Sequence, residues 1–483
     1  MLTPIEEAGL AGLGVAGRIR RALWQIPEPE LRALLDSIAQ EAGRRHLVYL
    51  RDDREETIRL LAMPVAALPD QLAYVRAVAL ALHGALKRLP ELYVTDPDVC
   101  AALQLPPAED EWLRQCWTPA VREQNTVFGR HDAVVDFTSA NWKNTLAFVE
   151  PNLGGIGGLH LVPTAERILA DLVVPVLRKN DPLLQLEVAQ DMRNLLMQEM
   201  IDHLQALGRP ARTICFIDPK YAGSGPDEQS ALTEHFHARF GITVCHADPR
   251  ELERRGDEVY YEGQPIDLAY RDYPIIDLLA LAREGVDIGP MRLLFEQNRI
   301  VSSIAAELDQ KSCWEVLGEP TLAERHFSAD ERQLFRRHLP WTRLIADRAT
   351  TLLDGSRGPL LEYVRREREQ LVLKPNRAYG GTGIHLGPST PQGEWDALID
   401  RAVADPERWV AQQLVNLPVL EFPVLDPAGH VHAEPFFTVM GFAPSTYGLA
   451  TLVRASQKQV VNIAQRGGMC ALMVAHPPGR IVL

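Results

Sequence analysis

Apolar residues recur every three to four positions over roughly the first 120 residues, which is the spacing of one buried helix face. The stretches GRIRRALWQI, ELRALLDSIAQEAGRR and LAYVRAVALALHGALKRL carry this pattern most clearly. We therefore expect a helical N-terminal region over residues 1–120, in which nothing points to a catalytic role. Two more helices are expected over 163–208.

The pattern changes near residue 212. TICFIDP predicts a buried strand, DEQSALTEHFHARFG an amphipathic helix, and ITVCHADP a second strand. This β-α-β order implies parallel pairing and predicts a lobe over 211–320. Further on, LVLKPNRAYGGTGIHLG predicts strand, glycine loop and strand, and the DPAGH turn predicts a hairpin. The expected fold class is therefore α/β (α+β).

Another hairpin, from Arg130 to Asn152, concentrates charged and amide side chains. Residues two apart in a strand share a face, so Arg130 points with Asp132, and Glu150 with Asn152. If the strands pair symmetrically about Asn141, Asp132 lies opposite Glu150, and facing carboxylates repel each other. A Mg²⁺ ion would remove that repulsion, because it binds oxygen ligands, commonly carboxylates together with substrate phosphates. The alternative is an ordinary hairpin with a solvated polar face.

Two glycine-rich stretches suggest places where a ligand approaches the backbone. GGIGGLH (154–160) directly follows the acidic hairpin, and a mobile loop is its alternative interpretation. The second stretch follows a strand that delivers Lys374, and it contains Gly380, Gly381 and Gly383. Its backbone N–H groups and the lysine charge would suit a phosphate, with a plain β-hairpin as the alternative. It is neither a P-loop nor a dinucleotide-binding fingerprint, because no GKS or GKT follows and the next element is a strand.

Two later stretches are weaker candidates for nucleotide contacts. The strand WVAQQLV would present amides and backbone groups to an adenine edge, although a buried strand is the simpler interpretation. The residues of this stretch that would contact the adenine are Gln412, Gln413, Leu414 and Val415. VRASQKQVVNIAQRGG supplies Arg454 and Asn462, which would bind a triphosphate or a carboxylate, and a solvated strand pair is the alternative.

The totals describe an ordinary globular chain of 483 residues, 46% hydrophobic and 24% charged, long enough for several domains. No apolar run reaches the length of a membrane helix, so no membrane partner is expected. The net charge of −14 argues against nucleic acid. The six cysteines are scattered without a CxxC motif, which favours buried thiols in a reducing cytoplasm.

Together these stretches resemble the circularly permuted ATP-grasp family, and are similar to the synthetase domain of glutathionylspermidine synthase. The resemblance covers about residues 121–483 and rests on the R-x-D and E-x-N strands, the K-P…G-x-G loop, ELDQKS and PWT. It implies a hairpin-and-helix part of the ATP-grasp domain over 121–210, a pre-ATP-grasp lobe over 211–320, and an ATP-binding part over 321–483. The extra helical N-terminal region has no counterpart in the family.

The resemblance also implies roles for individual residues. Asp132, Glu150 and Asn152 would bind Mg²⁺, and Arg130 would lie at the reaction centre. Lys311, Lys374, the three glycines and residues 412–415 would hold ATP, with Arg454 and Asn462 on the triphosphate or a substrate carboxylate. The turn between the acidic strands is longer than in the family, which leaves Asp136 as an alternative metal ligand.

The implied activity is ATP- and Mg²⁺-dependent ligation of a small-molecule or peptide carboxylate to an amine or a thiol through an acyl phosphate. Glutathione and spermidine do not carry over, because the family's amidase domain is missing. A homo-oligomer is possible. Two other classes stay open: a nucleotide-binding scaffold without activity, and a phosphotransferase that stops at the phosphorylated product.

Overall fold

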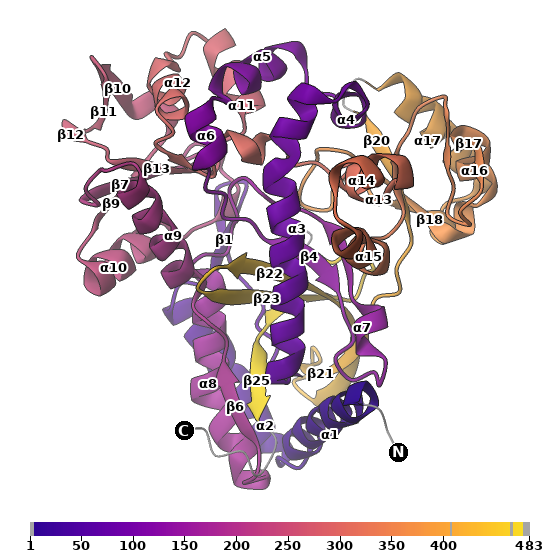
Figure 1. Ribbon diagram of the computed structural model, residues 1–483. Coiled ribbons are helices and arrows are strands. Elements are labelled where there is room, and N and C mark those ends of the chain that lie inside the picture. The colour runs from indigo at the N-terminus through magenta and orange to yellow at the C-terminus, as the bar shows by residue number, and fades with distance from the viewer. Residues whose placement is uncertain (1–3, 406–407, 464–466, 477–483) are drawn as a thin grey trace.

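The computed structural model describes residues 4–405, 408–463 and 467–476. Its longest helix, α3 (Pro69–Thr95), runs through the middle of the molecule (Figure 1). Pro69 suits the first helical position because its missing N–H would have no partner there, and the Gln71 side chain accepts a hydrogen bond from the backbone N–H of Leu68. The apolar stripe of α3 is buried, as the helical spacing of its sequence predicts.

Other long helices cover the same body. They are α1 (Pro4–Trp24), α2 (Glu28–Arg44), α8 (Leu161–Asn180) and α9 (Met192–Ala206). The two helices expected over 163–208 are therefore present. Shorter helices of the body are α4 (Pro97–Leu103), α5 (Pro107–Cys116), α6 (Pro119–Glu123), α13 (Cys313–Gly318), α14 (Pro320–His326) and α15 (Ala329–His338). No helix in the described ranges combines the length and apolarity needed to cross a membrane.

Short strands interrupt the N-terminal region, which is therefore not helical throughout. They are β1 (Val48–Arg51), β2 (Arg54–Thr57) and β3 (Val65–Ala67). Strand β3 lies parallel to β25 (Leu472–His476), which also pairs with β6 (Gln185–Val188). Segments from the start, the middle and the end of the chain thus share one small sheet. The domain boundaries that we drew from the sequence remain predictions.

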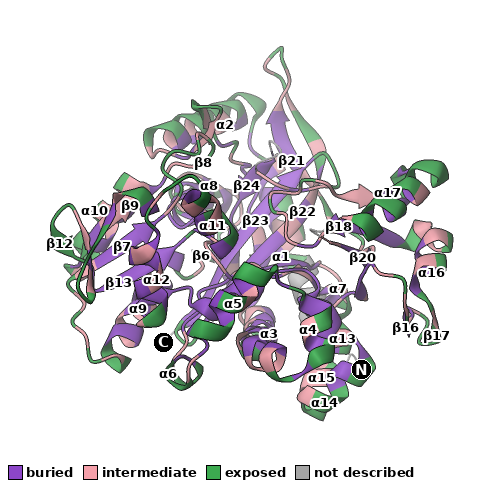
Figure 2. Cartoon of the chain, turned by 90° about the horizontal axis from the view of Figure 1, so that it is seen from above, coloured by how far each residue is buried: buried purple, intermediate pink, exposed green. Residues whose placement is uncertain are grey.

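The largest sheet joins the acidic hairpin to the C-terminal part of the chain. Its strands are β4 (His131–Val134), β5 (Ala147–Glu150), β21 (Val419–Leu425), β22 (Val431–Ser445), β23 (Gly448–Ser456) and β24 (Gly468–Cys470). Their order is β24-β23-β22-β4-β5, and β21 pairs with β22 around the predicted DPAGH turn. Figure 2 shows that the long strands of this sheet are largely buried, whereas exposed residues lie on the surrounding helices.

A second lobe contains the predicted parallel sheet. Strand β7 (Thr213–Ile217), helix α10 (Gln229–Phe240) and strand β9 (Thr243–Ala247) form the expected β-α-β unit, and β7 and β9 are parallel. The lobe also contains β13 (Leu268–Arg271), β14 (Ile300–Val301), α11 (Ile275–Arg283) and α12 (Gly289–Glu296). A separate small sheet consists of β10 (Leu252–Arg255), β11 (Glu258–Tyr261) and β12 (Gln264–Pro265). The four parallel strands follow the order β14-β13-β7-β9.

A smaller lobe, residues 341–413, has a hydrophobic core of its own. Its sheet has the order β15-β20-β18-β19, covered by two helices. These elements are β15 (Thr342–Leu344), β18 (Leu371–Pro375), β19 (His385–Leu386), β20 (Trp409–Gln413), α16 (Leu360–Arg366) and α17 (Gln392–Ala404). The predicted order of strand, glycine loop and strand is found between β18 and β19.

Candidate active site

One cavity of about 660 Å³ lies where the large sheet, the parallel lobe and the smaller lobe meet. Its volume falls in the range of small-molecule sites. Most of the residues singled out from the sequence line it: Arg130, Asp132, Glu150, Asn152, Lys374, Gly380, Gly381, Gln412, Gln413, Leu414, Val415, Arg454 and Asn462. Segments more than 300 residues apart in the chain therefore meet at one place.

The acidic hairpin has the predicted register at its outer end, and the register shifts by one residue after Asp132. Asp132 pairs directly with Glu150, and the backbone N–H of Arg130 donates to the carbonyl of Asn152 at 2.8 Å. The Asn152 side-chain nitrogen donates back to the carbonyl of Arg130 at 2.9 Å. A β-bulge follows Asp132, and a short helix, α7 (Trp142–Thr145), occupies the connection.

Basic side chains compensate both carboxylates of this pair. Arg454 Nη2 lies 2.6 Å from Asp132 Oδ2, and Arg130 Nε lies 3.5 Å from Asp132 Oδ1. Lys311 Nζ lies 2.9 Å from Glu150 Oε1. Repulsion between the two acids therefore does not require a metal ion, which corrects the argument made from the strands alone. Burial raises the pKa of Asp132, but Arg454 and Arg130 more than offset it, so this pKa lies below its ordinary value.

Asp136, the alternative metal ligand, has a local role in the connection between the strands. Its Oδ1 accepts hydrogen bonds from the backbone N–H and the hydroxyl of Thr138, at 2.9 and 2.6 Å. This is the Asx-turn arrangement by which a short acidic side chain stabilises a turn. Asp136 is not among the residues that line the cavity, so the position opposite Glu150 belongs to Asp132.

Lys374 enters the cavity from β18. Its Nζ donates to Gln412 Oε1 at 2.8 Å on the neighbouring strand β20, and the Gln412 amide nitrogen donates to Thr342 Oγ1 at 3.0 Å. Burial lowers the pKa of Lys374 to about 8, although the nearby Glu150 acts in the opposite direction. The Gln412 side chain is occupied by protein partners and holds Lys374 in place. The predicted adenine contact of Gln412 therefore has no free side-chain group to make it, and the adenine contacts predicted for residues 413–415 remain predictions.

The glycines after β18 have backbone conformations that other residues adopt with strain. Gly380, Gly381 and Gly383 have φ angles of 73°, 75° and 71°. A Cβ on Gly383 would also lie 2.8 Å from the ring of Pro375. Gly380 and Gly381 line the cavity, whereas Gly383 packs behind the loop.

Lys311 lies behind the acidic pair, and is not among the lining residues of the cavity. Besides its ion pair with Glu150, its Nζ donates to the carbonyl of Ala378 at 2.7 Å. This lysine thus connects the hairpin to the loop after β18.

The glycine segment, residues 154–158, is held by hydrogen bonds at both ends, which favours an ordered segment over the mobile loop of the alternative interpretation. Asp309 Oδ2 accepts from the backbone N–H groups of residues 153 and 154, at 2.6 and 3.1 Å. The Glu228 carboxylate accepts from the N–H groups of residues 158, 160 and 161 at 2.7–3.0 Å. Between them, the Tyr270 hydroxyl accepts from residue 156, and Arg130 donates to the carbonyl of residue 157. The segment therefore forms a fixed wall of the cavity.

The parallel lobe supplies cavity residues that sequence reasoning missed. Asp272 follows β13 directly, and Asp277, Glu307 and Asp309 line the same part of the cavity. Ligands of parallel sheets bind outside the carboxyl ends of the strands, so the position of Asp272 in YRDYP was a usable signal. Asp309 lies in ELDQKS, from which only the lysine was selected.

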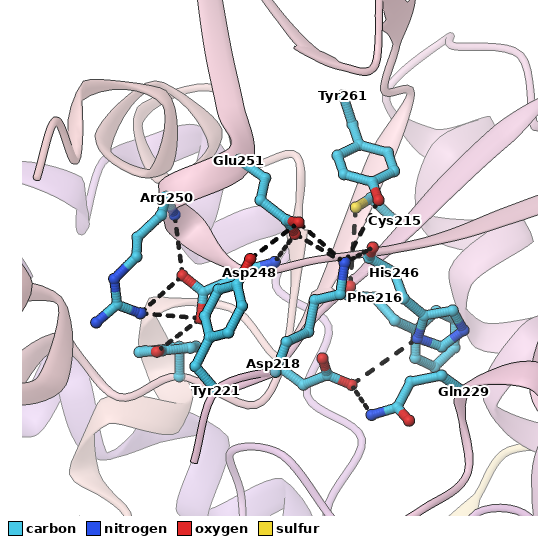
Figure 3. A network of polar contacts seen from close by, with 12 residues as sticks. Cys215, Phe216, Asp218, Tyr221, Gln229, His246, Asp248, Arg250, Glu251 and Tyr261 are labelled. Atoms are coloured by element: carbon cyan, nitrogen blue, oxygen red, sulfur yellow. Dashed lines mark hydrogen bonds and ion pairs between the residues drawn. The ribbon is translucent and has the colours of Figure 1, made fainter. Parts of the chain in front are cut away.

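A polar network ties together the loops that follow β7 and β9 (Figure 3). Lys220 Nζ lies 2.8 Å from Glu251 Oε2, and the Gln229 side chain donates to Asp218 Oδ2 at 3.1 Å. Pro219, which lies between Asp218 and Lys220, lines the cavity. The network thus fixes this edge of the lobe beside the site.

The donor set fits a Mg²⁺ ion in chemical type. Asp132, Glu150 and Asn152 offer only oxygen ligands, and the short ion pairs use one oxygen of each carboxylate. In the described part of the chain, no group of three or more His, Cys, Asp or Glu side chains could hold a metal. The candidate site therefore depends on the amide oxygen of Asn152 and on substrate phosphates.

Comparisons with known proteins place the fold. No family model matches the chain. A stretch of 115 residues is 31% identical to a putative glutamate–cysteine ligase 2-3 of Frankia alni, covering 22% of this chain and 13% of that protein. An uncharacterized protein of Mycobacterium leprae is 26% identical over 282 residues, covering 55% of this chain and 46% of that protein. The matches thus span less than half the length of either relative.

Among solved structures, a glutathione synthetase-like effector from Globodera pallida aligns with 93% of this chain and 98% of its own, with a TM-score of 0.60 and 12% identity. A RimK-domain ATP-grasp protein from Sphaerobacter thermophilus aligns with 53% of this chain at a TM-score of 0.26, which is too low to argue from. The expected α/β (α+β) fold class is confirmed, and the chain shares its fold with the glutathione synthetase-like effector. The circular permutation and the likeness to glutathionylspermidine synthase remain predictions.

Proposed function

We propose that the chain is an ATP- and Mg²⁺-dependent ligase that joins a small-molecule or peptide carboxylate to an amine through an acyl phosphate. The observation that carries the proposal is the facing pair Asp132 and Glu150 in one cavity with Lys374 and two arginines. The fold shared with a glutathione synthetase-like protein, and the partial match to a putative glutamate–cysteine ligase, support the same reaction class.

The reaction needs charge neutralisation and positioning more than covalent help from the protein. Lys374 would bind the terminal phosphates of ATP under Gly380 and Gly381. Asp132, Glu150 and Asn152 would hold a Mg²⁺ ion, which supplies positive charge to the phosphates when bound. Residues 413–415 would contact the adenine.

The arginines would act on the second substrate. Arg130 and Arg454 lie beside Asp132, and each presents a buried positive charge to the cavity. They would bind the substrate carboxylate while one of its oxygens attacks the γ-phosphorus, and then stabilise the oxyanion that forms when the amine attacks the acyl phosphate. Collapse of this tetrahedral intermediate breaks the C–O bond to phosphate, which leaves, and the nitrogen loses a proton to give the amide. The fixed glycine segment would exclude water from the acyl phosphate.

The test is ADP release in the presence of Mg²⁺, with candidate carboxylates and amines added singly and together. A ligase releases ADP and forms an amide only when both substrates are present, or forms a hydroxamate when hydroxylamine replaces the amine. A phosphotransferase would release ADP and a phosphorylated product without forming an amide, even when the amine is present. Mg²⁺-dependent ATP binding without turnover of any substrate pair would favour the nucleotide-binding scaffold, and absence of ATP binding by calorimetry would refute the proposal.

A further inference from the structure

A second cavity, of about 570 Å³, lies between the C-terminal half of α3, the segment around α6, and α9. In the described part of the chain, it shares no lining residue with the cavity of the candidate active site. Its volume is again that of a small-molecule site. Trp117, Thr126 and His203 are buried and form its floor, whereas Arg88 and Arg122 are exposed at its rim. A ligand could therefore enter from solvent and reach buried protein surface.

The floor of the second cavity is held by the protein itself. His203 Nε2 donates to the carbonyl of Asn298 at 2.7 Å, and its Nδ1 accepts from the Thr126 hydroxyl at 2.9 Å. Burial lowers the pKa of His203, which agrees with a neutral ring that donates from one nitrogen and accepts at the other. Both ring nitrogens are thus occupied, so recognition of a ligand falls to the partly buried side chains above the floor.

Lys87, which lines this cavity from α3, has an uncompensated charge. It is partly buried, and among the residues that the structure describes it has no ion pair and no hydrogen bond. Arg88 and Arg122 differ, because each forms an ion pair with a glutamate. Burial lowers the pKa of Lys87, and the opposing effect of Glu199 is smaller. An anionic group on a ligand would supply the missing counter-charge.

Two acceptors in the same cavity also lack a donor. Asn125 Oδ1 is buried and accepts no hydrogen bond from the described residues. Glu199 Oε1 accepts from the hydroxyls of Ser445 and Thr446, at 2.6 and 3.1 Å, whereas no contact from the described ranges reaches its Oε2. Because an unpaired buried acceptor is unfavourable, a ligand that carries N–H groups would be stabilised here.

The charges around the cavity argue against a simple anion such as phosphate. The acidic lining residues are Glu91, Glu123, Glu199 and Asp202, and the basic ones are Lys87, Arg88 and Arg122. A phosphate would therefore meet more negative than positive charge. A zwitterion has no net charge to repel, and it offers one group to the unpaired lysine and the other to the unpaired acceptors.

We propose that the second cavity binds a free α-amino acid as its zwitterion. The carboxylate would lie at Lys87, and the ammonium would donate to Asn125 Oδ1 and Glu199 Oε2. An α-amino acid carries both groups on one carbon, so the two ends can be held together in a cavity of this size. This site is separate from the proposed ligase site, and binding there needs neither ATP nor Mg²⁺.

The test screens the twenty protein amino acids singly by thermal unfolding of the full chain, without nucleotide, and measures the most stabilising one by calorimetry. Its N-acetyl derivative and its primary amide each lack one charge and should bind at least about tenfold more weakly. Lys87→Met and Asn125→Leu should each weaken binding of the amino acid to a similar extent. Lys179→Met removes an exposed lysine of α8, and as the matched control it should leave the affinity unchanged.

No stabilisation by any of the twenty amino acids would overturn the inference. So would binding that survives both Lys87→Met and Asn125→Leu, because the amino acid would then occupy another site, such as the candidate active site. Equal affinity for either derivative would also overturn it, since one of the two charges would go unrecognised. Should Lys87→Met not fold, Asn125→Leu still decides the question. Each of these failures leaves the proposed ligase function standing, because that function is tested by ATP binding and turnover.

Discussion

Asp132 offers the sharpest test of the proposed metal site, because two arginines hold it in place without a metal. Its side chain and that of Arg454 are only 10% and 7% exposed, and their closest atoms are 2.6 Å apart. Asp132→Asn keeps the shape of the side chain but removes its charge, so two buried guanidinium groups lose their anion. Removing one partner of a buried ion pair costs about 3–5 kcal/mol. That is a large part of the roughly 5–15 kcal/mol by which a folded domain is stable.

We expect Asp132→Asn to lower the midpoint of thermal unfolding and to abolish the Mg²⁺-dependent part of ATP binding. The double variant Asp132→Asn/Arg454→Met removes both charges and should recover most of the stability, since replacing a buried pair as a whole is often neutral. It should not recover Mg²⁺-dependent binding. Asp136→Asn is the matched control, because it removes a charge from the same hairpin outside the cavity.

Scanning calorimetry gives the stability, and titration of ATP with Mg²⁺ or with EDTA gives the metal-dependent increment. Wild-type affinity for the Mg²⁺–ATP complex in Asp132→Asn would refute the reasoning, and the facing acids would then be a structural ion-pair network. Loss of Mg²⁺ dependence in Asp136→Asn would instead return the ligand role to the alternative aspartate.

Four further predictions concern other parts of the site. At about pH 9, ATP binding should take up about one proton. Lys374, whose pKa is about 8, is then mostly neutral, and the bound phosphates should restore its positive charge. Calorimetry in buffers of different ionisation enthalpy measures the number of protons taken up. In the free protein, this lysine makes stability rise with pH between 8 and 10.5, since there the unfolded chain binds more protons. Gly383→Ala should destabilise the chain by about 1–3 kcal/mol more than Gly256→Ala in denaturant unfolding, because both have positive φ but only the first would meet a proline ring. Glu228→Gln should speed hydrogen exchange in the glycine segment, whereas the exposed Glu234→Gln should not; equal protection would show that other contacts hold the segment.

The sequence predicted those features of the site that depend on residues close to one another along the chain. Alternation along two short strands was enough to set Asp132 opposite Glu150, and the strand before the glycines was enough to place Lys374. The bulge after Asp132 and the helix in the connection were not predicted. Neither alters the alternation of Arg130 with Asp132 and of Glu150 with Asn152, on which the prediction was based. The metal, catalytic and nucleotide roles of these residues remain predictions.

Contacts between distant segments could not be predicted in the same way. Arg454 was selected for a phosphate or a carboxylate, but its ion pair with Asp132 depends on β4 pairing with β22, which no local pattern encodes. The strand β3 was missed because three residues are too few to show a period, and it is defined by its pairing with β25. The acidic cavity residues Asp272, Asp277 and Asp309 were missed for a different reason. The first follows β13, the second lies in the first turn of α11, and the third follows a 3-10 turn, so no local pattern joins them.

The separate hydrophobic core of residues 341–413 determines which side of the cavity can open. The glycine segment is anchored by two carboxylates, a tyrosine and an arginine, so that wall stays where it is. The smaller lobe brings Lys374 and the loop after β18, and its interior packs independently of the main body. If the chain binds a nucleotide as proposed, we expect any closure over it to move this lobe against the rest of the molecule. The pivot would lie near Lys311, whose ammonium contacts both Glu150 and the carbonyl of Ala378.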